Sequence, residues 1–251
     1  MTAALRMEWL RLRTVRSTFW LLSVATLAMV GIGVTVLAIY RTHLPRPGAA
    51  QMVNDGLSGV ALGQLLIGFL GVLVVTGEYS SGMIRATLAA VPNRRRVLAA
   101  KAAVFAGSGF VVAEVACFAT FFASQAALSG SPVPQAGLGE AGVLRTVALS
   151  GVYLTLIGLL GVGLGAVIRH TGAAIAALFG LLFVPTFVLG ALGSAGMAIA
   201  KFTPMIILLN SVGVVTPTPG CLSAWAGLGV IALYAVVALG LGGWLITRRD
   251  A

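Results

Sequence analysis

Long apolar runs separated by short polar segments dominate the pattern of this 251-residue chain. A helix needs about 20 mainly apolar residues to cross a bilayer, and six runs are long enough. The pattern therefore predicts an all-α, polytopic membrane protein made of a single transmembrane domain. The predicted spans lie at about residues 19–40, 57–76, 102–122, 143–168, 172–192 and 222–247.

Two further segments have a mixed pattern. In residues 1–17, Met1, Leu5, Trp9 and Leu12 share one helical face and the arginines lie on another, which predicts a helix lying on the membrane surface. A plain positively charged flank is the alternative interpretation. Residues 193–221 are neither fully polar nor long enough in apolar character to span, so we expect them outside the membrane or as a re-entrant pair of short helices.

Glycines recur inside the spans and predict where helices pack closely. Residues 158–165, with the sequence GLLGVGLG, lie inside an apolar span with no strand before them, so they are typical of a close-packed helix face and not of a dinucleotide loop. Gly59 and Gly63 form a small-xxx-small pair that allows close approach of a second helix. Because the chain holds 33 glycines, such a pair can arise by chance, and this is the favoured interpretation.

Composition leaves little room for a soluble domain, since 59% of residues are hydrophobic and 9% are charged. The net charge of +10 would suggest nucleic acid in a soluble protein. Here the basic residues cluster near the ends of spans, so membrane topology explains them better and no nucleic acid is expected.

The distribution of Lys and Arg predicts the orientation in the membrane, because cytoplasmic loops carry the excess. With six spans, one side has twelve basic residues and the other has four. The richer side holds both termini and residues 77–101, which are therefore expected in the cytoplasm of a protein of the cell membrane. The twelve are Arg6, Arg11, Arg13, Arg16, Arg85, Arg94, Arg95, Arg96, Lys101, Arg169, Arg248 and Arg249; the four are Arg41, Arg46, Arg145 and Lys201.

The loop at residues 77–101 is the longest interruption between two membrane-length runs. Ser80 or Ser81 is suited to cap a short helix, and Pro92 would end it. Asn93 is suited to cap the next helix, whose first turn holds three arginines. An apolar stripe at near-helical spacing lies between these signals, formed by Met83, Ile84, Leu88 and Val91, with Arg85 off the stripe.

This order of capping, apolar and helix-ending residues predicts a short amphipathic helix at the membrane surface, followed by a sharp turn and a span. One interpretation is an ordinary positively charged loop whose arginines face anionic membrane lipid. The other, which the ordered helix signals favour, is a docking site for a soluble partner.

The loop resembles the segment between the second and third spans of ABC-2-type transporter permeases, the membrane subunits of ATP-driven transporters. The matching positions are Glu78, Gly82, Leu88, Pro92, Arg94 and Lys101. The resemblance implies that the loop supplies a coupling helix that touches a nucleotide-binding subunit. The residues that would make this contact are Glu78, Met83, Ile84, Arg85, Leu88, Val91, Arg94 and Arg95.

The resemblance also implies an exporter that works as a homodimer, or as a heterodimer with a related permease. ATP and Mg would be bound by the partner ATPase, with no cofactor in this chain. The sequence agrees, because a P-loop needs Gly-Lys followed by Ser or Thr. Lys101 is followed by Ala102, and Lys201 by Phe202.

No set of residues suited to catalysis or metal binding is visible in the sequence. His43 and His170 are isolated, and no His, Cys and carboxylate cluster occurs. We therefore predict that the chain itself is not an enzyme and holds no metal.

Glu114 lies inside the third predicted span, where a charge costs at least ~2.5 kcal/mol. It is expected to be protonated, paired or facing a polar cavity. Two interpretations stay open: a place in the translocation path, or a protonated contact between helices. An ion- or proton-coupled secondary transporter is the alternative function, but such a relay needs several deep ionisable groups and Glu114 is the only one.

Overall fold

The computed structural model describes residues 16–40, 48–84, 93–130, 135–214 and 220–248. Within these ranges the chain is helical without strands, and six helices are long and apolar enough to cross a membrane. The predicted all-α, six-span architecture of a multi-pass membrane protein is confirmed. Almost all of the predicted interfacial helix at 1–17, and most of the predicted coupling helix, lie outside the described residues.

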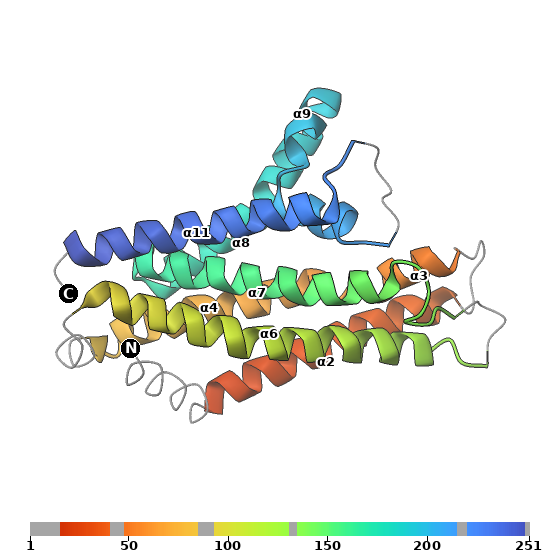
Figure 1. The fold of residues 1–251 in the computed structure, drawn as a ribbon, viewed down its shortest axis with the longest axis horizontal. Coiled ribbons are helices and arrows are strands. Elements are labelled where there is room, and N and C mark those ends of the chain that lie inside the picture. Colours follow the sequence, from red (N-terminus) through yellow and green to blue (C-terminus); the bar gives the residue numbers. More distant parts are fainter. Residues whose placement is uncertain (1–15, 41–47, 85–92, 131–134, 215–219, 249–251) are drawn as a thin grey trace.

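The helices run lengthwise and form an elongated bundle (Figure 1). Their bounds are α2 Arg16–Tyr40, α3 Ala49–Gly56, α4 Val60–Ser80, α6 Arg94–Ala126, α7 Val143–Ile168, α8 Thr171–Ala191, α9 Gly193–Ala200, α10 Pro204–Ile206, the π-helix η1 Ile207–Ser211 and α11 Ala224–Arg248.

The second span is a broken helix, where the sequence predicted a polar loop before residue 57. α3 and α4 are separated by a turn at residues 57–59. A Cβ on Gly59 would lie 2.2 Å from the carbonyl oxygen of Met29, and a Cβ on Gly33 would lie 2.2 Å from the carbonyl oxygen of Gly56. The backbone of α2 is therefore in direct contact with the backbone on both sides of the turn between α3 and α4. Gly63 also faces Met29, so the Gly59 and Gly63 pair is a true helix contact and not a spacing by chance.

α7 occupies the centre of the bundle and packs against α4, α6, α8 and α11. The predicted close-packed glycine face is confirmed at its contact with α4. A Cβ on Gly161 would lie 2.2 Å from the Gly68 carbonyl oxygen, and one on Gly71 would lie 2.0 Å from the Gly158 carbonyl oxygen. Small residues allow this approach, and lipid-embedded helices depend on such packing because they gain no hydrophobic energy by leaving lipid.

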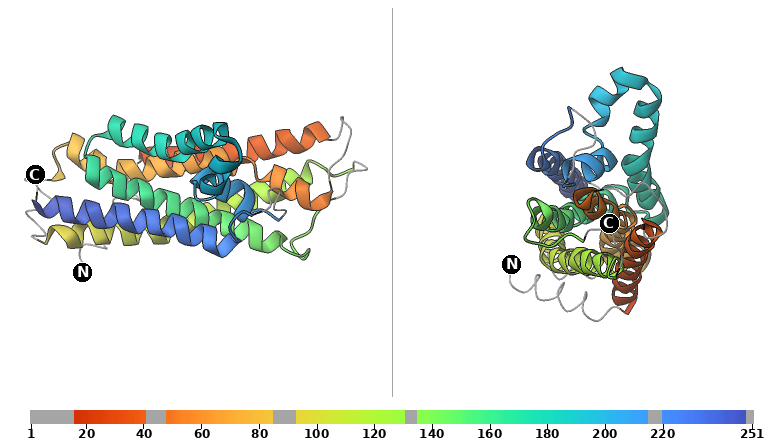
Figure 2. Two further views of the ribbon diagram at one scale, coloured as in Figure 1. Left: turned by 90° about the horizontal axis from the view of Figure 1, so that it is seen from above. Right: turned by 90° about the vertical axis from the view of Figure 1, so that its right-hand side faces the viewer.

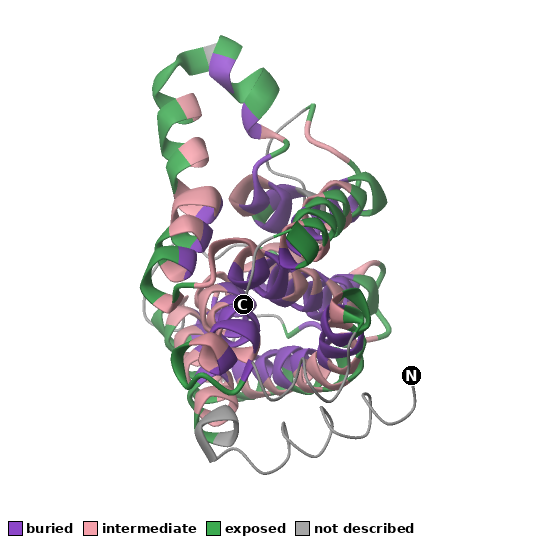
Figure 3. Cartoon of the chain, turned by 90° about the vertical axis from the view of Figure 1, so that its left-hand side faces the viewer, coloured by how far each residue is buried: buried purple, intermediate pink, exposed green. Residues whose placement is uncertain are grey.

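α8 lies at the edge of the bundle, and α9 continues away from it (Figure 2). Only Ala174, Leu178 and Leu182 of α8 are buried among the described residues. Figure 3 shows the outer part of α8 and α9 mostly exposed, whereas the buried residues gather where the other helices meet. This apolar edge is consistent with a helix that faces lipid or another subunit.

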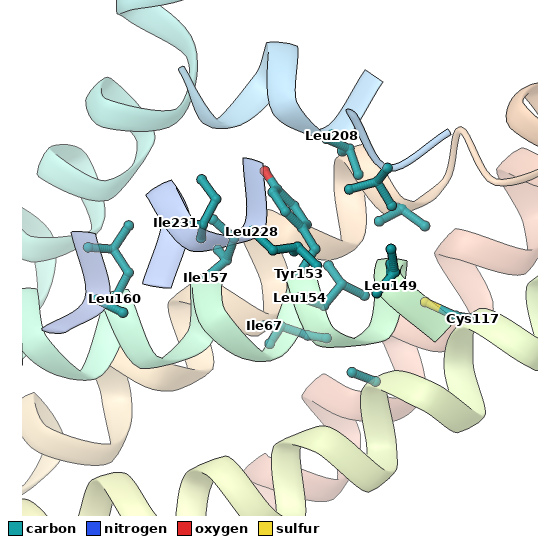
Figure 4. Close-up of a cluster of buried hydrophobic side chains, with 14 of the residues drawn as sticks. Ile67, Cys117, Leu149, Tyr153, Leu154, Ile157, Leu160, Leu208, Leu228 and Ile231 are labelled. Atoms are coloured by element: carbon teal, nitrogen blue, oxygen red, sulfur yellow. The ribbon is translucent and has the colours of Figure 1, made fainter. Parts of the chain in front are cut away.

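Residues 193–214 form the short helices α9, α10 and η1, and polar side chains tie the part after α9 to the bundle. The Tyr153 hydroxyl donates to Gln64 Oε1 at 2.6 Å and lies 3.0 Å from the Pro204 carbonyl oxygen. Asn54 Oδ1 accepts from the Val214 N–H at 2.7 Å. Irregular backbone at membrane depth needs such internal partners because lipid offers none. Figure 4 shows Tyr153 rising from α7 beside Leu154, Ile157 and Leu228.

Candidate functional site

One end of the bundle gathers the end of α4, the start of α6, the turn between α7 and α8, and the end of α11 (Figure 1, left). We call it the basic end, because the described charged residues of these four segments are Glu78 and six cations. The cations are Arg94, Arg95, Arg96, Lys101, Arg169 and Arg248. The predicted docking loop leaves and re-enters the bundle here, which makes this end the candidate functional site.

A buried ion pair ties the two sides of the loop together. Lys101 Nζ donates to Glu78 Oε1 at 2.5 Å, and the two residues are 3% and 7% exposed. The pair joins the last turn of α4 to the second turn of α6, across 23 residues of chain. Removing one partner of such a pair costs about 3–5 kcal/mol, because an unpaired charge is left buried. The Glu78 carboxylate is thus turned inward, away from the surface where the sequence predicted a partner contact.

At the start of the loop, the hydroxyls of Ser80 and Ser81 both donate to the Gly77 carbonyl oxygen, at 3.1 and 2.8 Å, and so close the end of α4. Most of the helix that either serine was predicted to cap lies outside the described residues. Gly82 then takes a left-handed conformation with φ of 71°, which glycine adopts without strain and which turns the chain.

The structure divides the predicted partner-contact residues by exposure. Met83 is 47% exposed, whereas its neighbour Ile84 is 6% exposed and packs inside this chain. Of the remaining members of the loop, Arg85, Leu88 and Val91 lie outside the described residues. Among the described apolar residues of the predicted contact, Met83 is therefore the exposed one.

Asn93 caps α6 as predicted, with Oδ1 accepting from the Arg96 N–H at 3.2 Å. Three arginines in the first turn oppose the helix dipole, whose N-terminal end is positive. Arg95 and Arg96 are exposed. Arg94 instead donates from Nη1 to the Ile246 carbonyl oxygen of α11 at 3.2 Å. Because they do not favour the helix locally, Arg95 and Arg96 are suited to an interaction outside this chain.

Arg169 is a residue of the basic end that the sequence did not single out. Its Nη2 donates to the Leu245 carbonyl oxygen at 3.3 Å, and its guanidinium lies 5.2 Å from the centre of the Tyr79 ring. With Arg94, it donates to carbonyl oxygens in the last turn of α11, as basic side chains often do near the C-terminus of a helix. Arg169 has φ of 60°, and this left-handed residue makes possible the abrupt turn from α7 to α8. The sequence signal that could have identified Arg169 is a basic residue in a very short turn between two spans.

Glu114, for which the sequence left open the translocation path and a protonated helix contact, lies on α6 with its carboxylate against α7. A Cβ on Gly151 would fall 2.5 Å from the Glu114 carboxylate carbon, so the absence of a side chain there makes room for the carboxylate. No described residue donates a hydrogen bond to it. The neighbouring Val111 and Val115 are exposed, which places Glu114 beside an outward-facing strip of α6. The structure does not bring it near the basic end.

The described residues include no group of three or more His, Cys, Asp or Glu that could hold a metal ion. Cys117 is buried and Cys221 is partly exposed, and neither forms a disulfide. Comparison of the sequence with models of known protein families gives no match, and comparison with curated proteins gives no significant one.

Proposed function

We propose that this chain is the permease subunit of an ABC-2-type exporter in the cell membrane, driven by ATP that a separate nucleotide-binding subunit hydrolyses. The observation that carries the proposal is the construction of the docking loop. Its two ends are tied together by the buried Glu78 and Lys101 pair, while Met83 and Arg95 face outward at the same end. The ends of the loop are thus fixed to the bundle, while side chains suited to contact a partner are exposed.

The fixed ends of the loop matter because coupling ATP hydrolysis to transport requires that a movement of the loop reaches the spans. α4 and α6 both pack against α7, so a push on the loop between them would act on the centre of the bundle. The ion pair would keep the ends of the loop from separating under that push. We infer that ATP-driven closure of the partner moves the loop, and that α4 and α6 then shift against α7 to alternate access across the membrane.

The excess of basic residues places the basic end in the cytoplasm in this proposal, where an ATPase is available. The working unit would contain two permease chains, either identical or related, and two ATPase chains. The exposed apolar edge of α8, with Phe187 and Val188, offers a surface for a second permease chain or for lipid.

The experiment that tests the proposal is purification from membranes of the source organism through a tag on this chain. We expect a co-purifying chain with a P-loop and ATPase activity, and loss of transport when the P-loop lysine of that chain is replaced. Transport by the chain alone in proteoliposomes, driven by a pH gradient without ATP, would instead support the ion-coupled alternative.

A further inference from the structure

A groove of about 650 Å³ lies between α6 and α11 and begins at the basic end. Its walls come from one face of each helix, and at 1.5 Å of rise per residue the wall on α11 is about 12 Å long. Because α6 begins and α11 ends at the basic end (Figure 1), Arg95 and Trp244 lie at the same end of the groove. We call this end the mouth. The walls beyond it are apolar, with Leu98, Ala102 and Val236.

Two arginines lie at the mouth. Arg95 lines the groove and is exposed. The guanidinium carbon of Arg248 lies 4.5 Å from the centre of the Trp244 ring, and Trp244 also lines the groove. Arg94 joins the two helices here, since its Nη1 donates to the Ile246 carbonyl oxygen at 3.2 Å. The mouth therefore presents guanidinium groups above an apolar channel.

The sequence around the mouth adds much positive charge and little negative charge. Residues 85–96 contain four arginines and no acidic residue, and residues 244–251 contain two arginines and one aspartate. Glu78, the described acidic residue of the basic end, is buried and paired with Lys101. An anion is therefore favoured at the mouth on electrostatic grounds.

The part of the groove beyond the mouth lies within two of the helices that are long and apolar enough to cross a membrane. Val236 in its wall is 65% exposed. At membrane depth such a surface needs an apolar cover. The groove as a whole thus calls for one occupant with an anion at one end and an apolar tail along the rest.

We propose that this groove binds an anionic phospholipid, with its phosphate at Arg95 and beside Arg248, and with an acyl chain lying between the walls of α6 and α11. Basic pockets between membrane-spanning helices bind anionic lipid headgroups in other proteins, and tryptophan rings such as that of Trp244 are enriched at headgroup level. The site goes beyond the proposed function and does not depend on an ATPase.

Other occupants fit the groove less well. A free phosphate would match the arginines and leave the apolar walls uncovered. A second copy of this chain is a poor source of the anion, because the sequence has six acidic residues against 16 basic ones. A zwitterionic lipid would cover the apolar walls without supplying net negative charge at the mouth.

The test uses the purified full chain in detergent, after removal of bound lipid. The probe is dioleoylphosphatidylglycerol, and dioleoylphosphatidylcholine is its counterpart with the same acyl chains and no net charge. Binding is followed as lipid-dependent thermal stabilisation, which reports saturable binding to the folded state. We expect phosphatidylglycerol to bind at least about tenfold more tightly, because its net charge is attracted by the arginines. Glycerol 3-phosphate, which lacks acyl chains, should give no saturable shift.

Two matched pairs of variants assign the site. Arg95→Gln and Arg96→Gln remove the same charge from neighbouring exposed residues, of which Arg95 lines the groove. The first should weaken phosphatidylglycerol binding about fivefold, and the second should weaken it much less. Gly240→Leu and Gly229→Leu add the same side chain to α11, at positions where no described atom lies within 4 Å of the new Cβ. Gly240 lines the groove, so its variant should bind about tenfold more weakly or worse, whereas the Gly229 variant should bind as the unmodified chain does.

The proposal is overturned if the two lipids bind equally tightly or if glycerol 3-phosphate saturates the protein by itself. Equal weakening by Arg95→Gln and Arg96→Gln would also overturn it, since a diffuse positive surface would then be sufficient. Absence of saturable binding by phosphatidylglycerol would have the same consequence. If Gly240→Leu fails to fold, the arginine pair and the comparison of the two lipids decide the matter. These measurements contain no ATPase, so failure here and failure of the proposed function are distinguishable.

Discussion

Glu78 and Lys101 form a buried ion pair that closes the loop between α4 and α6. Their positions near the ends of two spans put both charges at the margin of the membrane, yet each is turned into the protein. The pair sets the separation of the two helices at the point where the predicted docking loop begins and ends. Its effect on stability can be separated from its effect on coupling.

Lys101→Met should lower the free energy of unfolding by about 3–5 kcal/mol, because it leaves the Glu78 carboxylate buried without its cation. Thermal unfolding in detergent measures the effect. Lys201→Met is the control, since Lys201 is partly exposed and the chain has no other lysine. The double variant Glu78→Leu with Lys101→Met should recover most of the stability. Equal stability of the Lys101 and Lys201 single variants would contradict the buried pair.

Gly161→Ala should destabilise the bundle by about 1–3 kcal/mol, since the added methyl would overpack the contact with the Gly68 backbone. Gly180→Ala, in α8, is the matched control because no atom lies within 4 Å of its new Cβ. That variant should be neutral or stabilising by up to about 1 kcal/mol through helix propensity. Unfolding measurements should therefore show a loss of stability for Gly161→Ala alone, and an equal loss in both variants would argue against the close approach of α4 and α7.

The sequence predicted those parts of the fold that depend on local signals. Hydropathy gave the six spans, Asn93 marked the start of α6, and the GLLGVGLG run marked the packed face of α7. The pairing of Glu78 with Lys101 could not be predicted from the sequence, because pairing across 23 residues depends on how two helices lie in space. The same holds for Arg169 and for the groove between α6 and α11. Helix α3 was missed because its polar residues, including Asn54 and Asp55, resemble a loop until their tertiary partners are known.

The orientation of the bundle can be tested with single cysteines in a Cys221→Ser background, where the remaining Cys117 is buried. Arg95→Cys should be protected from a membrane-impermeant thiol reagent in intact cells, and Glu140→Cys should be labelled. Both residues are exposed at opposite ends of the bundle, so access depends on the side of the membrane. Labelling of position 95 from outside would reverse the proposed topology.

Glu114→Gln tests the translocation path. The amide keeps the shape that fits against Gly151 and removes the ionisable group, so we expect normal amounts of folded protein and reduced transport. Transport in vesicles and protein level are measured together, with Glu140→Gln as a control that removes an acid outside the spans. Full transport by the Glu114 variant would assign this residue to helix packing alone.

The docking loop gives the sharpest test, because neighbouring residues in it have opposite surroundings. Met83 is exposed and Ile84 is buried within this chain, so an aspartate at each position should fail for a different reason. Burial of a large apolar side chain is worth about 1.5–3 kcal/mol, and a small interface depends on a few such anchors.

Met83→Asp should therefore leave the thermal stability of the isolated chain unchanged while weakening co-purification of the ATPase. Leu88→Asp, further along the predicted helix, should abolish both co-purification and transport while the protein still inserts.

Ile84→Asp should instead lower the stability of the chain itself, because it buries a charge. Arg95→Ala should have a mild effect, since one solvated charge contributes about 0–1 kcal/mol. If Met83→Asp and Leu88→Asp both keep the partner and still transport, the loop is not the docking site.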